Sequence, residues 1–127
     1  MADEQKTRIG QLLSSIQNDF RDPVANLLNE VSRTRLEGMG QLTAIAEVEQ
    51  NNVRWTLEWQ DGPIHFDLNV VAAVEDDGKQ AKIGRVWVQR HASTAFDFDG
   101  HTPTTRMRRL TMFSLAEIRE AIDAEWG

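Results

Sequence analysis

The strongest constraint on the fold is a run of alternating segments in the middle of the chain. Segments 42–49, 53–60 and 64–75 each alternate apolar and polar residues, the pattern of β-strands that bury one face. In the second and third segments, the residues on the apolar face are Val53, Trp55, Leu57, Trp59, Ile64, Phe66, Leu68, Val70, Ala72 and Val74. Short polar turns separate the segments, so the pattern predicts an antiparallel β-meander.

The turns also predict the register of this meander. We take Asn51-Asn52 as a two-residue hairpin loop and place the second turn at Asp61-Gly62-Pro63. Because Pro63 cannot donate a closing hydrogen bond, we expect four residues in the second loop. The pairs that follow are Val48 with Trp55, Ala46 with Leu57, Ala44 with Trp59, Trp59 with Ile64, Leu57 with Phe66 and Trp55 with Leu68.

Two further strands are predicted, near 83–91 and 105–112, with a long loop over 92–104 between them. The facing of the fourth strand stays open, because two sets of apolar residues compete for its buried side. These sets are Ile83 with Trp87, and Val86 with Val88.

Helices are expected at both ends of the chain. At the N-terminus, two apolar stripes at helical spacing are Ile9, Leu12, Leu13, Ile16 and Phe20, then Val24, Leu27, Leu28 and Val31. Asp22-Pro23 between them resembles an N-cap followed by proline at the first helical position, which favours two helices over one helix kinked at Pro23. Gly38 and Gly40 would end the second helix.

The C-terminal helix has a specific start signal. Ser114 and Glu117 have the spacing of a capping box, and Phe113 with Ile118 has that of a hydrophobic staple. The expected fold is therefore one α+β domain spanning residues 1–127. It comprises two N-terminal helices, an antiparallel β-meander of four to five strands, and one C-terminal helix packed on the sheet.

The second face of this sheet is less polar than a solvated face would be. It carries Ile45, Val71, Ala73 and one of the pair Val86 and Val88. Such residues mark either a subunit contact or a second layer of packing within the chain.

Composition excludes several classes of protein. The chain of 127 residues has no cysteine, which rules out disulfides, thiol nucleophiles and cysteine-ligated zinc. Its N-terminus is polar and its longest apolar run is Val70 to Val74, so we expect no membrane partner and a cytoplasmic location.

Charge is unevenly distributed within the net −6. Segment 41–81 holds eight acids and two bases, whereas segment 82–109 holds six bases and two acids. The acidic total argues against nucleic-acid binding as the main function, although weak binding of nucleic acid or another anion by the basic segment stays open. The candidate anion-binding residues are Arg85, Arg90, Arg106 and Arg108.

A polar group on the third strand is a candidate site. His65, Asp67 and Asn69 alternate onto one face, and the expected register places Glu58 opposite His65. These side chains could hold a metal or act in acid–base chemistry, but a solvated face with a cross-strand contact is the simpler interpretation.

The long loop after the fourth strand is a second candidate. Between His91 and His101 it contains a serine, two aspartates, including Asp97, and an Asp-x-Asp-Gly fragment of a calcium loop. The other calcium ligands are missing after Gly100, and we interpret this segment as a polar loop.

The tryptophans allow two interpretations. Trp55 and Trp59 could line a ligand pocket between sheet and helices with Phe66 and Trp87, or they could fill the core.

No catalytic, nucleotide-binding or zinc-protease motif is present, and we expect no catalytic residue, metal or other cofactor. The leading hypothesis is a non-catalytic binding or protein–protein interaction domain, adaptor-like or chaperone-like, that forms a homodimer or binds a protein partner. The alternative is a small enzyme or ligand carrier, whose polar site would draw on His65, Asp67, His91, Asp97 or His101.

Overall fold

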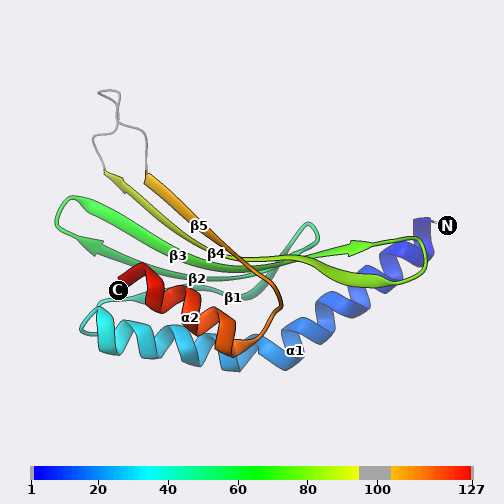
Figure 1. Ribbon diagram of the computed structural model, residues 1–127, viewed down its shortest axis with the longest axis horizontal. Helices are drawn as coiled ribbons and strands as arrows, with labels where there is room; N and C mark the ends of the chain where they lie inside the picture. Colours follow the sequence, from blue (N-terminus) through cyan, green and yellow to red (C-terminus); the bar gives the residue numbers. More distant parts are fainter. Residues whose placement is uncertain (1, 95–103, 127) are drawn as a thin grey trace.

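The computed structural model describes residues 2–94 and 104–126 (Figure 1). The elements follow one another as α1 (Ala2–Arg35), β1 (Gln41–Glu49), β2 (Asn52–Asp61), β3 (Ile64–Asp76), β4 (Ala81–Thr94), β5 (Thr104–Leu110) and α2 (Leu115–Trp126). The strands form one five-stranded antiparallel sheet in the order β1-β2-β3-β4-β5. The predicted meander and C-terminal helix are confirmed.

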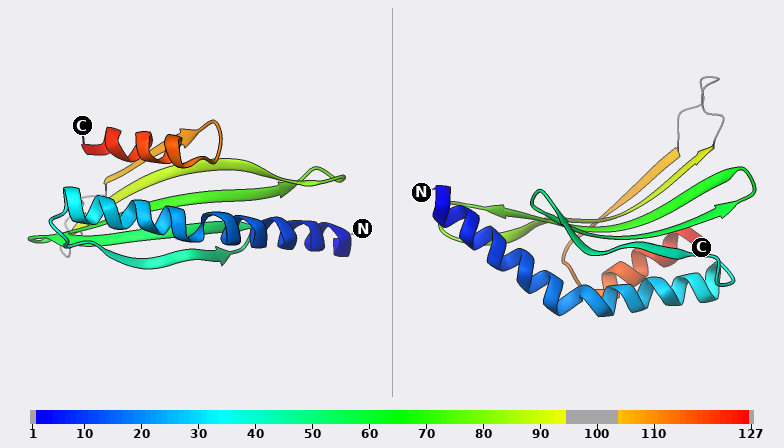
Figure 2. Two further views of the ribbon diagram at one scale, coloured as in Figure 1. Left: turned by 90° about the horizontal axis from the view of Figure 1, so that it is seen from below. Right: turned by 180° about the vertical axis from the view of Figure 1, so that it is seen from behind.

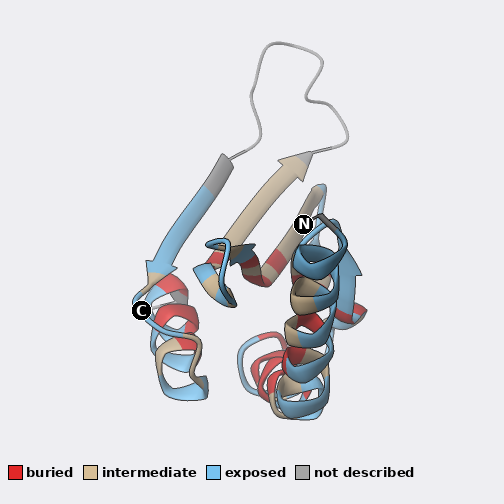
Figure 3. Cartoon of the chain, turned by 90° about the vertical axis from the view of Figure 1, so that its right-hand side faces the viewer, coloured by how far each residue is buried: buried red, intermediate tan, exposed pale blue. Residues whose placement is uncertain are grey.

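Both helices lie on the same side of the twisted sheet (Figure 2). Helix α1 packs on β1 to β4, and α2 packs on β4 and β5 beside it. Seen end-on, the helices and strands carry buried stretches where they meet, so the sheet has a covered face and an uncovered face (Figure 3). No helix in the described ranges is long and apolar enough to cross a membrane.

The prediction of two N-terminal helices is wrong, because α1 runs continuously through Pro23. The apolar stripes before and after the proline share one phase, with Phe20 followed by Val24 and then Leu27 at helical spacing. A single helix therefore presents one continuous stripe to the sheet. Pro23 removes one helical hydrogen bond, and α1 bends in its middle (Figures 1 and 2).

The exit from α1 is fixed by a close approach of helix and strand. The Gly40 amide donates to Ser32 Oγ at 2.9 Å, and Ser32 Oγ donates to the Gly40 carbonyl at 3.2 Å. A Cβ on Gly40 would lie 2.8 Å from Ser32 Oγ and 2.9 Å from Leu57 Cδ1, so the position accepts glycine alone without movement.

The opposite end of α1 is anchored to the β3–β4 hairpin. Arg8 Nε donates to Asp76 Oδ2 at 2.7 Å and Arg8 Nη2 donates to Asp76 Oδ1 at 3.0 Å. The Arg8 guanidinium, with a hydrogen bond from the Gly78 amide, holds the pKa of Asp76 below its usual range.

The two predicted hairpin registers are wrong by two residues each. The first loop is Gln50-Asn51, with Gln50 at φ 58°, so Val48 pairs with Val53. The second loop is Gly62-Pro63, with Gly62 at φ 60°; its closing pair is Asp61 with Ile64, so the proline nitrogen is not needed as a donor.

A shift of two residues keeps every side chain on its predicted face, so the facing of β2 and β3 is unchanged. The pairs that form are Trp59 with Phe66, Leu57 with Leu68 and Trp55 with Val70. In β1 the ladder is further broken by irregularities between Leu42 and Glu47.

The ambiguous facing of β4 has a structural cause. The ladder with β3 shifts between Ala73 and Val74, which leaves Gly84 as the extra residue of a bulge. Ile83 and Val86 therefore both reach the covered face although their spacing forbids this in a regular strand, and Trp87 points to the other face.

Helix α2 begins as predicted. The Glu117 amide donates to Ser114 Oγ at 3.3 Å, but the Glu117 carboxylate reaches beyond the cap to the Met112 amide at 2.9 Å and to Thr111 Oγ1 at 2.5 Å. Hydrogen bonds from the Thr111 hydroxyl and from the Met112 and Thr111 amides lower the pKa of Glu117. Phe113 packs on Phe20 of α1, with ring centroids 4.4 Å apart. The start of α2 thus joins both the strand before it and α1.

Candidate functional site on the uncovered sheet face

The uncovered face of the sheet is the surface on which the candidate residues gather. In β2 to β5, the described side chains that point to it are Arg54, Thr56, Glu58, Gln60, His65, Asp67, Asn69, Val71, Ala73, Arg85, Trp87, Gln89, His91, Ser93, Met107 and Arg109. No described helix packs on this face. Within the described ranges, this face therefore has no helical layer above it.

A hollow of about 250 Å³ lies on this face over the middle of the sheet. Its lining is Glu49, Asn52, Arg54, Asn69, Val71, Trp87 and Gln89. Within the described part of the chain, two buried donor atoms here, Trp87 Nε1 and Arg54 Nε, have no hydrogen-bond partner. A buried donor without an acceptor costs about 1–3 kcal/mol. A partner or ligand that placed an acceptor in this hollow would remove that cost.

The guanidinium of Arg54 is shared with two acids of β1. Its Nη2 lies 3.6 Å from Glu49 Oε2 and 3.9 Å from Glu47 Oε2. All three side chains are at least 40% exposed, so these ion pairs contribute little to stability.

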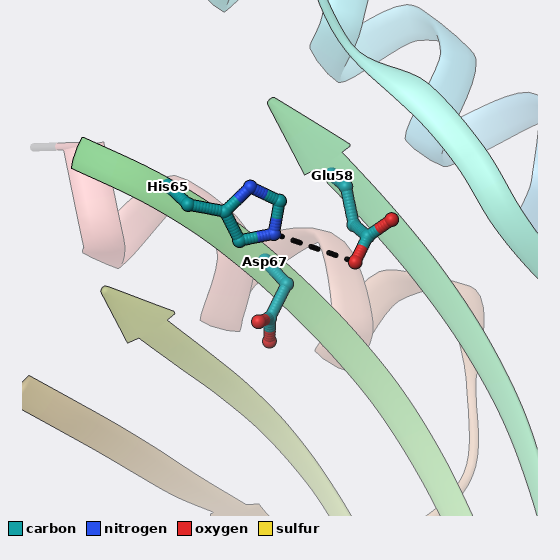
Figure 4. Close-up of side chains that lie close together, drawn as sticks. All are labelled: Glu58, His65 and Asp67. Atoms are coloured by element: carbon teal, nitrogen blue, oxygen red, sulfur yellow. Dashed lines mark ion pairs between the residues drawn. The ribbon is translucent and has the colours of Figure 1, made fainter. Parts of the chain in front are cut away.

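Further along the same face, Glu58, His65 and Asp67 form a cluster (Figure 4). His65 Nε2 lies 3.4 Å from Glu58 Oε1. The expected contact between these residues is therefore present, but it is diagonal, because Glu58 pairs with Asp67 and His65 pairs with Gln60. The three residues are half-buried and offer one donor atom each, all within 4.8 Å of one another.

A hydrogen-bonded chain orients Asp67 from the middle of the sheet. Thr56 Oγ1 donates to Asn69 Oδ1 at 2.6 Å, and Asn69 Nδ2 donates to Asp67 Oδ1 at 2.7 Å. Thr56 is buried, so the chain begins at a fixed point. One carboxylate oxygen of Asp67 is thereby held in place, and the other remains available.

Of the candidate residues in and before the long loop, the structure describes only His91. His91 lies on β4 directly across from Asp67, on the same face as the cluster. Asp97 and His101 lie outside the described residues.

The tryptophans do not share one pocket. Trp55 and Trp59 are buried on the covered face, where Trp59 stacks on Phe66 at 5.2 Å between ring centroids. Trp55 Nε1 donates to the Arg21 carbonyl of α1 at 3.1 Å. Trp87 points to the opposite face, so a pocket lined by all four aromatic residues is geometrically excluded.

Three of the four candidate arginines converge on Glu125, near the C-terminus of α2. Arg108 Nε donates to Glu125 Oε1 at 2.9 Å, Arg106 Nη1 lies 3.9 Å from Oε2, and Arg90 Nη1 donates to the Glu125 carbonyl at 3.3 Å. The Glu125 side chain is only 3% exposed. These arginines therefore have an anion within the protein, reinforced by the negative end of the helix dipole. Arg85 lies apart from them, on the uncovered face.

Sequence reasoning missed Glu125 and Arg54 as structural centres. For Glu125 a signal existed, because it follows Ile118 and Ile122 at helical spacing and so falls on the apolar side of α2. For Arg54 there was no comparable signal, since alternation predicts an exposed side chain and says nothing of what surrounds it.

Comparison of the chain with protein-family models, with curated proteins and with solved structures finds no match. Its function is therefore argued from this geometry alone.

Proposed function

We propose that this protein is a non-catalytic interaction domain that forms a homodimer through the uncovered face of its sheet. The observation that carries the proposal is the hollow around Trp87, where an apolar wall and unpartnered donors lie on a face that no described helix covers. Buried polar groups without partners are rare in folded proteins, and an interface is a common way of satisfying them.

The centre of this face is apolar along the middle strand. Val71 and Ala73 are successive residues on this face of β3, and Trp87 of β4 pairs with Val71. Met107 on β5 adds a 58% exposed apolar side chain to the same face. A centre of this kind with charges around it is the usual layout of an interface.

Charges on the two sides of this centre are opposite in sign. Glu47 and Glu49 lie on β1, whereas Arg85 and Arg109 lie on β4 and β5. A two-fold axis parallel to β3 would place the acidic side of one copy over the basic side of the other. This self-complementarity favours a second copy as the occupant.

The size of the face limits the area that a dimer can bury. Five strands about 4.8 Å apart, taken over a length of about 27 Å, give roughly 650 Å² per copy. A stable interface buries about 800 Å² per partner. The face is therefore smaller than a standard interface, and we expect a dimer that forms reversibly.

Sedimentation equilibrium or native mass spectrometry across a concentration series tests the proposal. The wild type should dimerise, and Arg109→Glu should weaken the dimer several-fold, because it places like charges opposite Glu47. Combining Arg109→Glu with Glu47→Arg should restore the dimer. Met112→Glu is the control, since it also introduces a carboxylate at an exposed position but lies after β5, outside the sheet.

A wild type that stays monomeric at high micromolar concentration would refute the proposal. So would a dimer that Met112→Glu weakens as strongly as Arg109→Glu does.

A further inference from the structure

We infer that Glu58, His65 and Asp67 form a binding site for a first-row divalent metal ion, with Zn²⁺ as the representative ion. This site lies on the same uncovered face as the proposed dimer contact, but all three ligands come from one chain and from two adjacent strands. The strands position it: Glu58 and Asp67 are directly paired, and His65 is two residues from Asp67 on the same face.

The distances within the cluster suit such an ion. Zinc–ligand bonds of about 2.0–2.1 Å in a tetrahedron place neighbouring donor atoms about 3.3 Å apart. His65 Nε2 and Glu58 Oε1 are already 3.4 Å apart, and all three donors lie within 4.8 Å of one another. Binding an ion therefore requires side-chain movement that brings donor atoms now up to 4.8 Å apart to about 3.3 Å.

Neighbouring side chains of the sheet orient one of the three ligands, Asp67. Asp67 Oδ1 accepts a hydrogen bond from Asn69, which in turn accepts one from the buried hydroxyl of Thr56. Groups that orient a ligating carboxylate in this way raise the affinity of metal sites. Thr56 and Asn69 lie outside the three ligands, so the arrangement extends beyond a chance contact of exposed charges.

The donor types select the class of ion. An imidazole nitrogen with two carboxylates suits Zn²⁺, Co²⁺, Ni²⁺ or Mn²⁺, whereas Mg²⁺ and Ca²⁺ prefer oxygen alone. Three protein ligands leave the fourth position of a tetrahedron open to water or to an atom of a partner. The ligands are only half-buried, so we expect moderate affinity and exchange with the medium.

Isothermal titration with Zn²⁺ tests the inference, with Co²⁺ and its visible absorption spectrum as a second readout. The wild type should bind one ion per chain. His65→Gln and Asp67→Asn should each lower the affinity at least tenfold and abolish the Co²⁺ spectrum. Glu47→Gln is the matched control: it removes an exposed carboxylate elsewhere on the same face and should leave binding unchanged. Thermal unfolding without metal verifies that each variant is folded.

Two outcomes would overturn the inference. One is no Zn²⁺ binding by the wild type at millimolar metal, and the other is binding that His65→Gln leaves intact. Arg109→Glu separates this inference from the proposed function, since it should weaken the dimer but bind Zn²⁺ as the wild type does.

Discussion

The two faces of strand β3 differ in what covers them. On the covered face, Leu68 and Val70 are fully buried beneath the helices. On the other face, Asp67 and Asn69 are half-buried, and Val71 is shielded without any described helix above it. Packing volume dictates the residues of the first face. On the second face no described helix sets such a volume, although Val71 and Thr56 are buried there among neighbouring side chains.

The largest expected difference in stability between the two faces comes from replacing one tryptophan on each. Trp55→Ala should lower the free energy of unfolding by about 3–5 kcal/mol, because it empties a fully buried site and removes the hydrogen bond to Arg21. Trp87→Ala should cost about 1 kcal/mol or less in the monomer. Urea unfolding of dilute protein measures both, and equal losses would show that the uncovered face is part of the core.

Ion pairs on the two faces give a second, smaller contrast. Glu125→Gln should destabilise the protein by about 1–3 kcal/mol, because the buried carboxylate accepts a charged hydrogen bond from Arg108. Glu47→Gln removes an exposed acid near Arg54 and should cost less than about 1 kcal/mol. Thermal unfolding of the two variants side by side checks the difference.

Acid unfolding provides the smallest and most local contrast. The pKa of Asp76 is lowered in the folded state, chiefly by the hydrogen bond from Arg8, so its contribution is fully present above the unfolded pKa of about 3.9. That contribution is lost as pH falls through the folded pKa. Asp76→Asn should therefore be less stable than wild type near neutral pH and should show less further loss below pH ~4. Urea midpoints at pH ~7 and ~3 measure this, and equal acid sensitivity of both proteins would contradict it.

Much of the architecture could be predicted from the sequence because alternation reports burial directly. The facing of Trp55 and Leu68 follows from that pattern alone, and the start of α2 follows from Ser114 and Glu117. The predicted hairpin registers were wrong because register depends on turn geometry. Gln50 adopts a left-handed backbone conformation, which is uncommon for glutamine and is not predictable from its side chain.

The single N-terminal helix was mispredicted for a different reason. Local chemistry at Asp22-Pro23 favours a helix start, but a continuous apolar stripe meeting a sheet outweighs the cost of one proline. The candidate cluster was predictable in part. Alternation placed His65 and Asp67 together, whereas the orienting chain from Thr56 depends on a register that the sequence alone does not fix.

The distant contacts of α1 have a consequence for the order in which the protein folds. Most of the stability of such a helix comes from packing its apolar side on the rest of the protein, not from the helix alone. The N-terminal half is anchored through Arg8 to a residue 68 positions later, and Arg119 of α2 joins Glu30 of α1 across 89 positions. Helix α1 thus precedes in the sequence the strands and the helix that cover its apolar side. Contacts across such separations cost more loop-closure entropy than the sequential hairpins of the sheet, so we expect the α1 stripe to be covered late in folding.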